Sequence, residues 1–262
     1  MEIVKVIIPI YKPLKDWEEF SLKNTINVLG KHPIAILKPK DLDVSSISSK
    51  YPQLEIISVT DEWLGTRNGI AGYNRMMMSK TFYEMFADYE YIFICHVDAW
   101  IFRDELLQWC EKGFDIIAAP WPLRPRYTYF PMKQFLWLRK HLLGRNKNLR
   151  SDMFGRIGNG GICIRKVASF SNACDKYAKE IEYYWSKKGE DLYNEDLFWA
   201  LEPKDFNYPS VETALQFAFD LKPRLCFQLN HQQLPMGCHG FQHKSRIEFW
   251  KLFLPKPLKI TL

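Results

Sequence analysis

Features that would place the protein in a membrane or in an oxidising compartment are missing from the sequence. No run of residues reaches the roughly 18 apolar positions of a membrane-spanning helix. The six cysteines never form a C-x-x-C pair, so neither a zinc finger nor a disulfide framework is predicted, and free thiols are expected, as in a cytosolic protein. The N-terminal stretch MEIVKVIIPIYK has no basic lead and no small-residue cleavage site, so we expect a core strand there and not a signal peptide.

Acidic residues are absent from one long stretch of the chain. No Asp or Glu occurs between Ile116 and Ser151, so the net charge of +6 is concentrated there and the rest of the chain is slightly acidic. Within it, residues 124–150 contain eight basic and five aromatic residues: Arg124, Arg126, Lys133, Arg139, Lys140, Arg145, Lys147, Arg150, Tyr127, Tyr129, Phe130, Phe135 and Trp137. Three interpretations stay open: a helix on an anionic membrane surface, an insertion that grips an acidic acceptor, or a helix whose charges face water. A nucleic-acid binder is not favoured, because no nucleic-acid module is recognisable and the remaining chain is not basic.

The order of the predicted elements indicates an α/β fold. With 262 residues, 47% of them hydrophobic, the chain is long enough for one large globular domain or two small ones. Strands are predicted at residues 4–10, 33–37 and 54–59, with helices between them at 16–29 and up to 49, which is typical of a parallel α/β layer. Further helices are predicted at 75–86, 104–112 and 166–187, and further strands in the first half of 91–102, at 114–119 and at 224–229.

The stretch YIFICHVDAWIF, residues 91–102, combines a buried strand with a sudden change of polarity. Its first half is uncharged and rich in β-branched and aromatic residues, and then His96 and Asp98 follow. A carboxylate where a buried strand ends is costly unless it is paired. In open α/β sheets ligands bind at that end of the strands. Asp98 is therefore either a ligand-binding residue or a cap of the turn or helix that follows.

Three other stretches are candidates for a binding site. TRNGIAGYN, residues 66–74, precedes a predicted helix, so together with Arg67 and Arg75 it forms either a diphosphate site or an ordinary loop and N-cap. The glycines in IGNGGICIR, residues 157–165, predict a close approach of the backbone to another group. Glu195 and Asp196 open a short helix, whose dipole stabilises carboxylates and explains them without any function.

Six short motifs together resemble a known family plan. VIIPIYK, YIFICHVDAWIF, DIIAAPW, GNGGICIRK, NEDLFW and LPMGCHGF follow one another over residues 3–241. In this order they resemble the GT-A glycosyltransferases, which transfer a sugar from a nucleotide-sugar donor. The sequence is most similar to a little-characterised bacterial family of GT-A-like proteins that was once classed as a domain of unknown function. The order of the motifs is specific, whereas no single motif is.

The resemblance implies a GT-A-like, Rossmann-related fold with a mostly parallel central sheet flanked by helices. It implies one domain over residues 1–262, with a nucleotide-sugar half at about 1–120, a basic aromatic-rich insertion at about 122–152 and an acceptor and catalytic half at about 153–262. The family's metal motif is usually Asp-x-Asp, whereas this chain has His96-Val97-Asp98 with one carboxylate. The similarity implies that Asp98 and His239 hold Mn²⁺ or Mg²⁺ together with donor phosphate oxygens, so a weakly held metal or none is expected.

The resemblance also assigns roles to the other motifs. For the nucleotide-sugar donor, with a UDP-sugar favoured, it implies contacts from Pro9, Tyr11, Arg67, Asn74, Arg75 and Asp98. For the acceptor sugar it implies contacts from Trp121, Asn159, Gly160 and Gly161. The general base is expected in the acidic pair, with Asp196 preferred over Glu195, because an acceptor hydroxyl is a poor nucleophile until its proton is removed.

The expected function is sugar transfer to a saccharide or lipid-linked acceptor in cell-surface polysaccharide synthesis. The expected location is the cytoplasm, with peripheral attachment to the inner face of the membrane. The alternative is a catalytically weak protein of the same fold that binds carbohydrate or nucleotide sugar. The single carboxylate of the His-Val-Asp motif favours this alternative, and the retained NED and GCH motifs argue against it.

Overall fold

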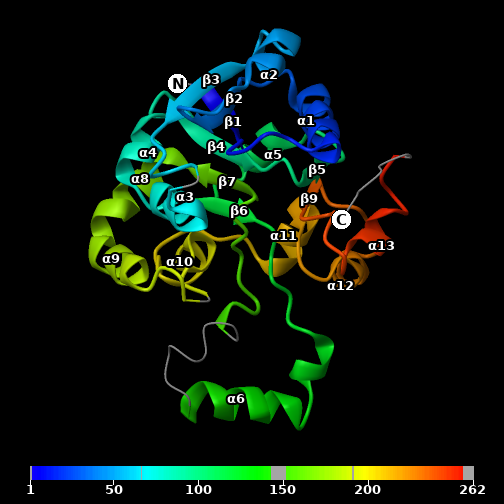
Figure 1. Ribbon diagram of the computed structural model, residues 1–262. Helices are drawn as coiled ribbons and strands as arrows, with labels where there is room; N and C mark the ends of the chain where they lie inside the picture. Colours follow the sequence, from blue (N-terminus) through cyan, green and yellow to red (C-terminus); the bar gives the residue numbers. More distant parts are fainter. Residues whose placement is uncertain (1, 66, 143–151, 191, 256–262) are drawn as a thin grey trace.

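A six-stranded sheet runs through the centre of the molecule (Figure 1). The computed structural model describes residues 2–65, 67–142, 152–190 and 192–255. The strands are β1 (Glu2–Pro9), β2 (Ile34–Pro39), β3 (Glu55–Val59), β4 (Tyr89–Cys95), β6 (Ile116–Ala118) and β7 (Ile162–Lys166), in the order β3-β2-β1-β4-β7-β6. All run parallel except β7, which is antiparallel to both of its neighbours, β4 and β6.

Helices cover both faces of this sheet, which explains why its strands are almost continuously apolar. In β1, Val4, Val6 and Ile8 pack on one face, while Ile7 packs on the other. The first face is covered by α1 (Asp16–Leu29) and α5 (Leu106–Glu111). The second face is covered by α3 (Gly69–Met77), α4 (Lys80–Glu84), α8 (Val167–Lys176), α9 (Ala178–Ser186) and α10 (Glu195–Leu201).

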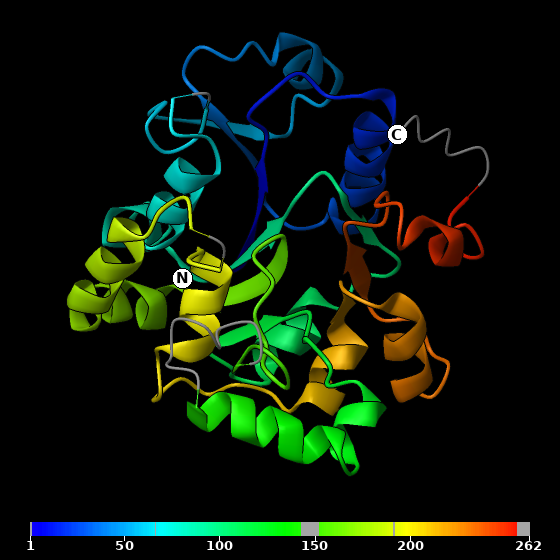
Figure 2. The ribbon, with the colours of Figure 1, turned by 60° about the horizontal axis from the view of Figure 1, so that its bottom comes forward.

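A small second sheet continues from the end of the central strand. After β4, a turn at residues 96–98 leads directly into β5 (Ala99–Ile101), which pairs antiparallel with β9 (Gly237–His239). β8 (Ala218–Phe219) completes this sheet on the other side of β9. The helices α11 (Val211–Phe217), α12 (Pro223–Leu229) and α13 (Ile247–Trp250) surround it. Figure 2 shows these C-terminal segments, in orange and red, on the side of the molecule opposite α8–α10.

The described part of the basic segment, residues 124–142, forms an arm that extends away from the sheets (Figure 1). It contains the short 3-10 helix η1 (Pro125–Thr128) and the helix α6 (Met132–Leu142). Large apolar side chains on the arm face solvent, among them Phe130 at 81%, Leu142 at 71% and Trp137 at 61% exposure. The arm is therefore not a helix packed onto the core. The side chain of Lys140 and the predicted basic residues Arg145, Lys147 and Arg150 lie outside the described residues.

Most predicted elements are confirmed, but three predictions were wrong in detail. The predicted helix 75–86 is the end of α3, which already begins at Gly69 in the predicted loop, followed by α4; the predicted helix 166–187 is α8 with α9. Residues 224–229 were predicted as a strand, yet they belong to the helix α12, which has Pro223 in its first turn. A short apolar run does not distinguish a strand from a buried helix, and proline at the first helical position favours the helix. The predicted helix 16–29 has the bounds of α1, and the short polar helix is α2 (Ser45–Lys50).

The structure also bears on the expectations about cysteines and about membrane-spanning helices. All six cysteines are buried, and none is in a disulfide. No helix in the described part of the chain has the length and apolar character needed to cross a bilayer. The division of the domain into donor, insertion and acceptor parts stays a prediction.

Candidate functional site

The turn that follows β4 carries two polar side chains and is fixed by backbone hydrogen bonds. The amide N–H of His96 donates to the carbonyl of Gly161 at 2.8 Å, and the N–H of Gly240 donates to the carbonyl of Asp98 at 2.9 Å. In the pairing of β5 with β9, Ala99 lies opposite His239. These contacts bring three distant segments, around residues 96–99, 159–161 and 239–240, to one point at the end of β4.

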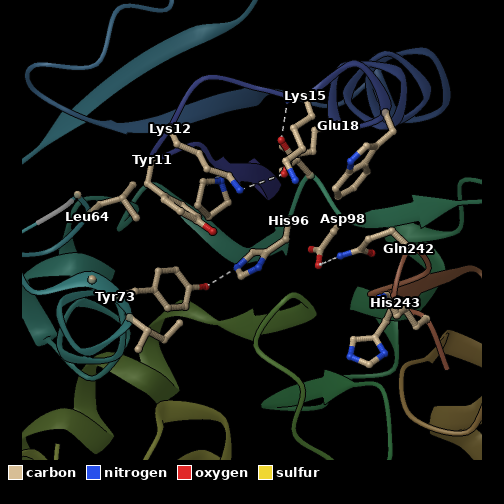
Figure 3. A pocket seen from close by; sticks show the side chains of 17 residues that line it. Tyr11, Lys12, Lys15, Glu18, Leu64, Tyr73, His96, Asp98, Gln242 and His243 are labelled. Atoms are coloured by element: carbon tan, nitrogen blue, oxygen red, sulfur yellow. Dashed lines mark hydrogen bonds and ion pairs between the residues drawn. The ribbon is translucent and has the colours of Figure 1, made fainter. Parts of the chain in front are cut away.

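Asp98, which Figure 3 shows beside Gln242, and His239 form the centre of the site. One carboxylate oxygen of Asp98 lies 3.1 Å from Nε2 of His239, and the other accepts a hydrogen bond from Nε2 of Gln242 at 3.0 Å. On the far side of its ring, Nδ1 of His239 lies 3.3 Å from Oδ1 of Asp220. Asp220 in turn accepts a hydrogen bond from Arg246 at 2.7 Å. His239 is thus held between two carboxylates.

The surrounding carboxylates make His239 a cation. Burial alone would lower the pKa of His239, but the negative charges and hydrogen bonds of Asp98 and Asp220 raise it to about 10. Burial would likewise raise the pKa of Asp98, but the charge of His239 and its hydrogen bond hold that pKa well below its usual range. At neutral pH the pair is therefore an imidazolium and a carboxylate.

His96 is neutral and is oriented by Tyr73. Burial lowers the pKa of His96 to about 4, because the charged ring would lose its hydration. The hydroxyl of Tyr73 lies 2.8 Å from Nε2 of His96, and the two rings meet edge to face (Figure 3). Since the ring is uncharged, Tyr73 donates and Nε2 accepts in the tautomer with the proton on Nδ1.

His96, Asp98 and His239 together could hold a divalent metal ion. A ligand atom from each of the three lies within 4.8 Å of the other two. Two imidazole nitrogens and one carboxylate oxygen suit a divalent transition metal. His239 must lose a proton, and Nε2 of His96 must release the Tyr73 hydroxyl, before the two rings can bind such an ion, so metal binding would release a proton. Oε1 of Gln242 is buried beside this group with no hydrogen-bond partner among the described residues, so an acceptor atom is available for a bound ligand.

The two glycines of the GNGG motif are needed because other side chains occupy their space. A Cβ on Gly161 would lie 2.1 Å from Nε2 of His239, and a Cβ on Gly160 would lie 1.9 Å from a carboxylate oxygen of Glu195. Asn159 fixes the turn, since its side-chain oxygen accepts from the N–H groups of Gly161 and Ile162 at 3.0 and 3.1 Å. The predicted close approach of this backbone is confirmed, and it is an approach to side chains of the site itself.

A cleft of about 850 Å³ opens over His96 and Asp98 (Figure 3). Pro9 and Tyr11 line it, as the sequence predicted for the donor, and the Tyr11 side chain is 51% exposed. Its cations, Lys12, Lys15 and Lys244, were not among the residues predicted from the sequence. Lys12 lies 3.5 Å from Glu18. Lys12 and Lys15 directly follow β1, so their position at the carboxyl end of a parallel strand was the available signal.

The three residues predicted to hold the donor phosphates from the 66–75 stretch do not line this cleft. Arg67 is exposed and lies 3.3 Å from Glu62. Arg75 pairs with Glu182 at 2.5 Å, and its guanidinium lies over the ring of Trp185. The side chain of Asn74 accepts a hydrogen bond from the N–H of Glu195 at 3.4 Å. In place of these residues, Gly69, Ile70 and Tyr73 of α3 line the cleft.

The acidic pair separates into one buried ion pair and one less buried carboxylate. Glu195 accepts a hydrogen bond from Arg165 at 2.6 Å, and the two side chains are 3% and 1% exposed. Asp196 is half-buried, and burial and the neighbouring charge of Glu195 raise its pKa to about 8. Arg165 also donates to the hydroxyl of Tyr83 at 2.8 Å. Trp121, predicted to touch the acceptor, is buried next to Gly158, where a Cβ would lie 3.1 Å from its ring.

Comparison with known proteins places this site in a familiar fold. The family model described as "Protein of unknown function (DUF5672)" matches residues 53–239. No curated protein matches the sequence. One similar solved structure is an active-site mutant of LgtC, with a TM-score of 0.58 and 13% identity, covering 98% of this chain and 100% of that chain. A second is the galactosyltransferase LgtC with donor and acceptor sugar analogs, with a TM-score of 0.57 and 10% identity, covering 96% of this chain and 98% of that chain. A third is mouse xyloside xylosyltransferase 1, with a TM-score of 0.52 and 9% identity, covering 94% of this chain and 98% of that chain.

The likeness to these structures concerns the fold. At such low identities it shows a mixed α/β domain with a mostly parallel sheet, as in GT-A glycosyltransferases, and the predicted fold class is confirmed. The predicted bacterial origin and the roles of the individual site residues stay predictions.

The buried pair of Arg165 and Glu195 yields a stability prediction. Replacing Arg165 by Met leaves the Glu195 carboxylate buried and unpaired, so we expect a loss of about 3–5 kcal/mol in the free energy of unfolding at pH 7. Urea denaturation measures this loss. The matched control is Arg165→Met combined with Glu195→Gln, which removes both charges and should recover most of the stability. Equal stability of the single variant and the wild type would contradict a structural role for the pair.

Proposed function

The chain belongs to the DUF5672 family of proteins of unknown function, and we propose that it is a glycosyltransferase that uses a nucleotide-sugar donor. The observation that carries the proposal is the meeting of His96, Asp98 and His239 at the carboxyl end of β4, where His96 and Asp98 line a cleft together with Tyr11 and several cations. Ligands of open α/β sheets bind at this edge. The acceptor is a saccharide or a lipid-linked glycan of the cell surface.

A divalent ion held by His96, Asp98 and His239 is part of this proposal. When bound, it supplies positive charge where the leaving diphosphate gains negative charge. Of Mn²⁺ and Mg²⁺ we favour Mn²⁺, because two of the three donor atoms are imidazole nitrogens and Mg²⁺ strongly prefers oxygen. Asp220 orients His239 from behind, as carboxylates do for metal-binding histidines.

The first cleft offers contacts for the base and for the diphosphate of a nucleotide-sugar donor. The exposed ring of Tyr11, with Pro9 beside it, offers a face on which a nucleotide base can stack. Lys12, Lys15 and Lys244 offer positive charge to the diphosphate, a role that the sequence had given to Arg67 and Arg75. A UDP-sugar remains the favoured donor.

Asp196 is the better candidate for the general base. Glu195 is committed to Arg165 and is almost fully buried, so it cannot reach an acceptor hydroxyl without breaking an ion pair. Asp196 is half-buried and its pKa is raised to about 8, which increases its basicity when it is ionised.

The donor site is tested by thermal shift with UDP and Mn²⁺. The wild type should melt at a higher temperature with both present, because a ligand selective for the folded state stabilises by about 2.7 kcal/mol at 100 times its Kd. Asp98→Asn should fold, lose the Mn²⁺-dependent part of the shift and lose sugar transfer. The exposed control Asp41→Asn should behave like the wild type.

Two outcomes of that experiment separate the alternatives. A full shift in the Asp98→Asn protein would exclude Asp98 from the site. A full shift in the wild type without any turnover of UDP-sugars, with or without added glycans, would favour the nucleotide-sugar-binding protein over the enzyme.

Asp196→Asn should lower turnover by about two to four orders of magnitude with little change in UDP affinity. Because the base acts only when ionised, kcat/KM of the wild type should rise tenfold per pH unit up to about pH 8 and then level off.

The raised pKa also means that Asp196 stabilises the fold at low pH and that this contribution is lost as pH rises through about 8. The stability of Asp196→Asn relative to the wild type should therefore increase from about pH 4, where this carboxyl ionises in the unfolded chain, to about pH 8, and stay level above that.

The control for this experiment is Asp88→Asn, an exposed carboxylate on the connection to β4. A pH profile of kcat/KM that is flat between pH 6 and 9, or an active Asp196→Asn protein, would remove Asp196 from the mechanism.

We also propose that the arm formed by η1 and α6 attaches the protein to an anionic membrane. Its exposed Phe130, Phe135 and Trp137 supply apolar contact, and Lys133 and Arg139 lie among them. Each basic residue near such a surface contributes about 1 kcal/mol, so the attachment should weaken as salt increases.

Co-sedimentation with vesicles tests the arm. The wild type should sediment with anionic vesicles at low salt and remain in solution with neutral ones. Phe135→Ser combined with Trp137→Ser should weaken the binding several-fold, whereas the control pair Leu107→Ser and Leu229→Ser, exposed apolar residues on α5 and α12, should not. Equal, negligible binding to both kinds of vesicle would contradict attachment through the arm.

A further inference from the structure

A second cleft, of about 500 Å³, lies where the arm leaves the body of the protein. Its walls come from residues 124–126 at the root of the arm, from the start of α12 and from the segment that leads into α13. Four of its lining residues are cations: Arg124, Arg126, Lys222 and Arg224. Its one carboxylate, that of Glu248, is already paired with Lys251 at 2.6 Å. The cleft therefore carries an excess of positive charge.

Aromatic rings, and not carboxylates, hold three of these cations in place. The contacts are Arg126 over Tyr127 (4.9 Å), Lys222 over Phe154 (4.9 Å) and Arg224 over Phe249 (5.9 Å). The rings of Tyr127 and Phe154 stack on each other at 6.0 Å, which joins the arm to the segment after it. Within the described ranges, none of the four cations forms an ion pair with a carboxylate. Apart from one hydrogen bond from Arg126 to the Tyr127 hydroxyl, their donors remain available to a ligand.

Holding these four cations close together costs free energy unless an anion balances their charge. Lys222 has a left-handed backbone with φ of 55°, which is uncommon for a residue other than glycine, and the residue is partly buried. Burial and the neighbouring charges of Arg124 and Arg126 both lower the pKa of Lys222. Two pairs of cations, almost a hundred residues apart in the chain, are thus brought together against their mutual repulsion. A bound anion would relieve it.

We propose that this second cleft binds a phosphate or diphosphate group of the acceptor. Phosphate oxygens accept paired hydrogen bonds from guanidinium groups, and three of the four cations are arginines. Lysine adds a point charge with three further donors. Four uncompensated positive charges match the two or three negative charges of a diphosphate better than the single charge of a carboxylate.

The position of the cleft links this phosphate to the acceptor. Gln242 and Lys244 line the first cleft, and Ser245 and Phe249 line the second, so one chain segment separates the two. Lys222 follows Asp220, the carboxylate that holds His239, by two residues. With the donor in the first cleft, a molecule anchored by its phosphate in the second can present a sugar toward Asp98. The existence of the anion site stands on its own observations, whereas its assignment to the acceptor rests on the proposed function.

Calorimetric titration with inorganic pyrophosphate at low ionic strength, with UDP present to occupy the first cleft, tests the anion site. Arg124→Gln combined with Arg224→Gln removes two exposed cations of the cleft and should weaken pyrophosphate binding at least tenfold. The matched control, Lys23→Gln with Lys179→Gln, removes the same charge from exposed positions on α1 and α9 and should retain the wild-type affinity within about twofold. Equal affinities of the two double variants would overturn the proposal.

Two further measurements distinguish a lipid phosphate from a soluble one, and a failure of this proposal from a failure of the proposed function. Sedimentation with phosphatidylcholine vesicles, with and without phosphatidic acid, asks whether the cleft accepts a phosphate on a lipid. A selective loss of phosphatidic-acid binding in the Arg124→Gln/Arg224→Gln protein assigns a lipid phosphate, whereas loss of pyrophosphate binding alone assigns a soluble one. UDP binding is measured on the same proteins and should not change. If the wild type fails to bind UDP, the proposed function fails while the pyrophosphate result still decides the second cleft.

Discussion

The pairing of β5 with β9 is the constraint on which the site depends. It joins residues about 140 positions apart and sets Ala99 opposite His239, so that the residue before β5 and the last residue of β9 become neighbours. β5 itself continues from the central strand of the large sheet through a three-residue turn. Asp98 is therefore placed by the large sheet and His239 by the small one. Their side chains meet where the two sheets adjoin. The distance between Asp98 and His239 is therefore set by the backbone hydrogen bonds of the two sheets.

The electrostatics of the junction follow from that geometry. A buried carboxylate at the end of an apolar strand would be costly, and here it is compensated by an imidazolium and an amide. The imidazolium in turn lies between two carboxylates, and Arg246 balances the second of them. A divalent ion would replace the proton on His239 and take over its role as the cation between the carboxylates. The site is therefore complete in charge without a metal, and metal binding competes with protons, which agrees with the weakly held metal expected from the single carboxylate of the His-Val-Asp motif.

The sequence was sufficient to predict a helix or a site residue where one hydrophobic periodicity or the end of one apolar strand determined it. The helix 16–29 was predicted with its correct bounds because its apolar positions recur at helical spacing, and Asp98 was selected because a charge followed a buried strand. Side-chain direction was not predictable in the same way. Arg67 and Arg75 had the right charge in the right stretch, yet both pair with glutamates outside the cleft, one of them 107 residues away along the chain. The pairing of Glu195 with Arg165 likewise depends on the antiparallel direction of β7, which a strand of five residues does not reveal.

The segment from Gly240 to Phe249 lies between the two clefts, and Arg246 links it to the carboxylate behind His239. Arg246 donates to Asp220 and lies against the carbonyls of His239 and Gly240 at 3.3 and 3.5 Å. Gly240 has φ of 61°, and a Cβ there would lie 2.2 Å from the Arg246 guanidinium, so the turn and the arginine require each other. The same arginine therefore fixes the carboxylate behind His239 and the wall between the clefts. A ligand that moves this wall in one cleft must disturb hydrogen bonds in the other, so occupancy of the two clefts is expected to be thermodynamically linked and not independent.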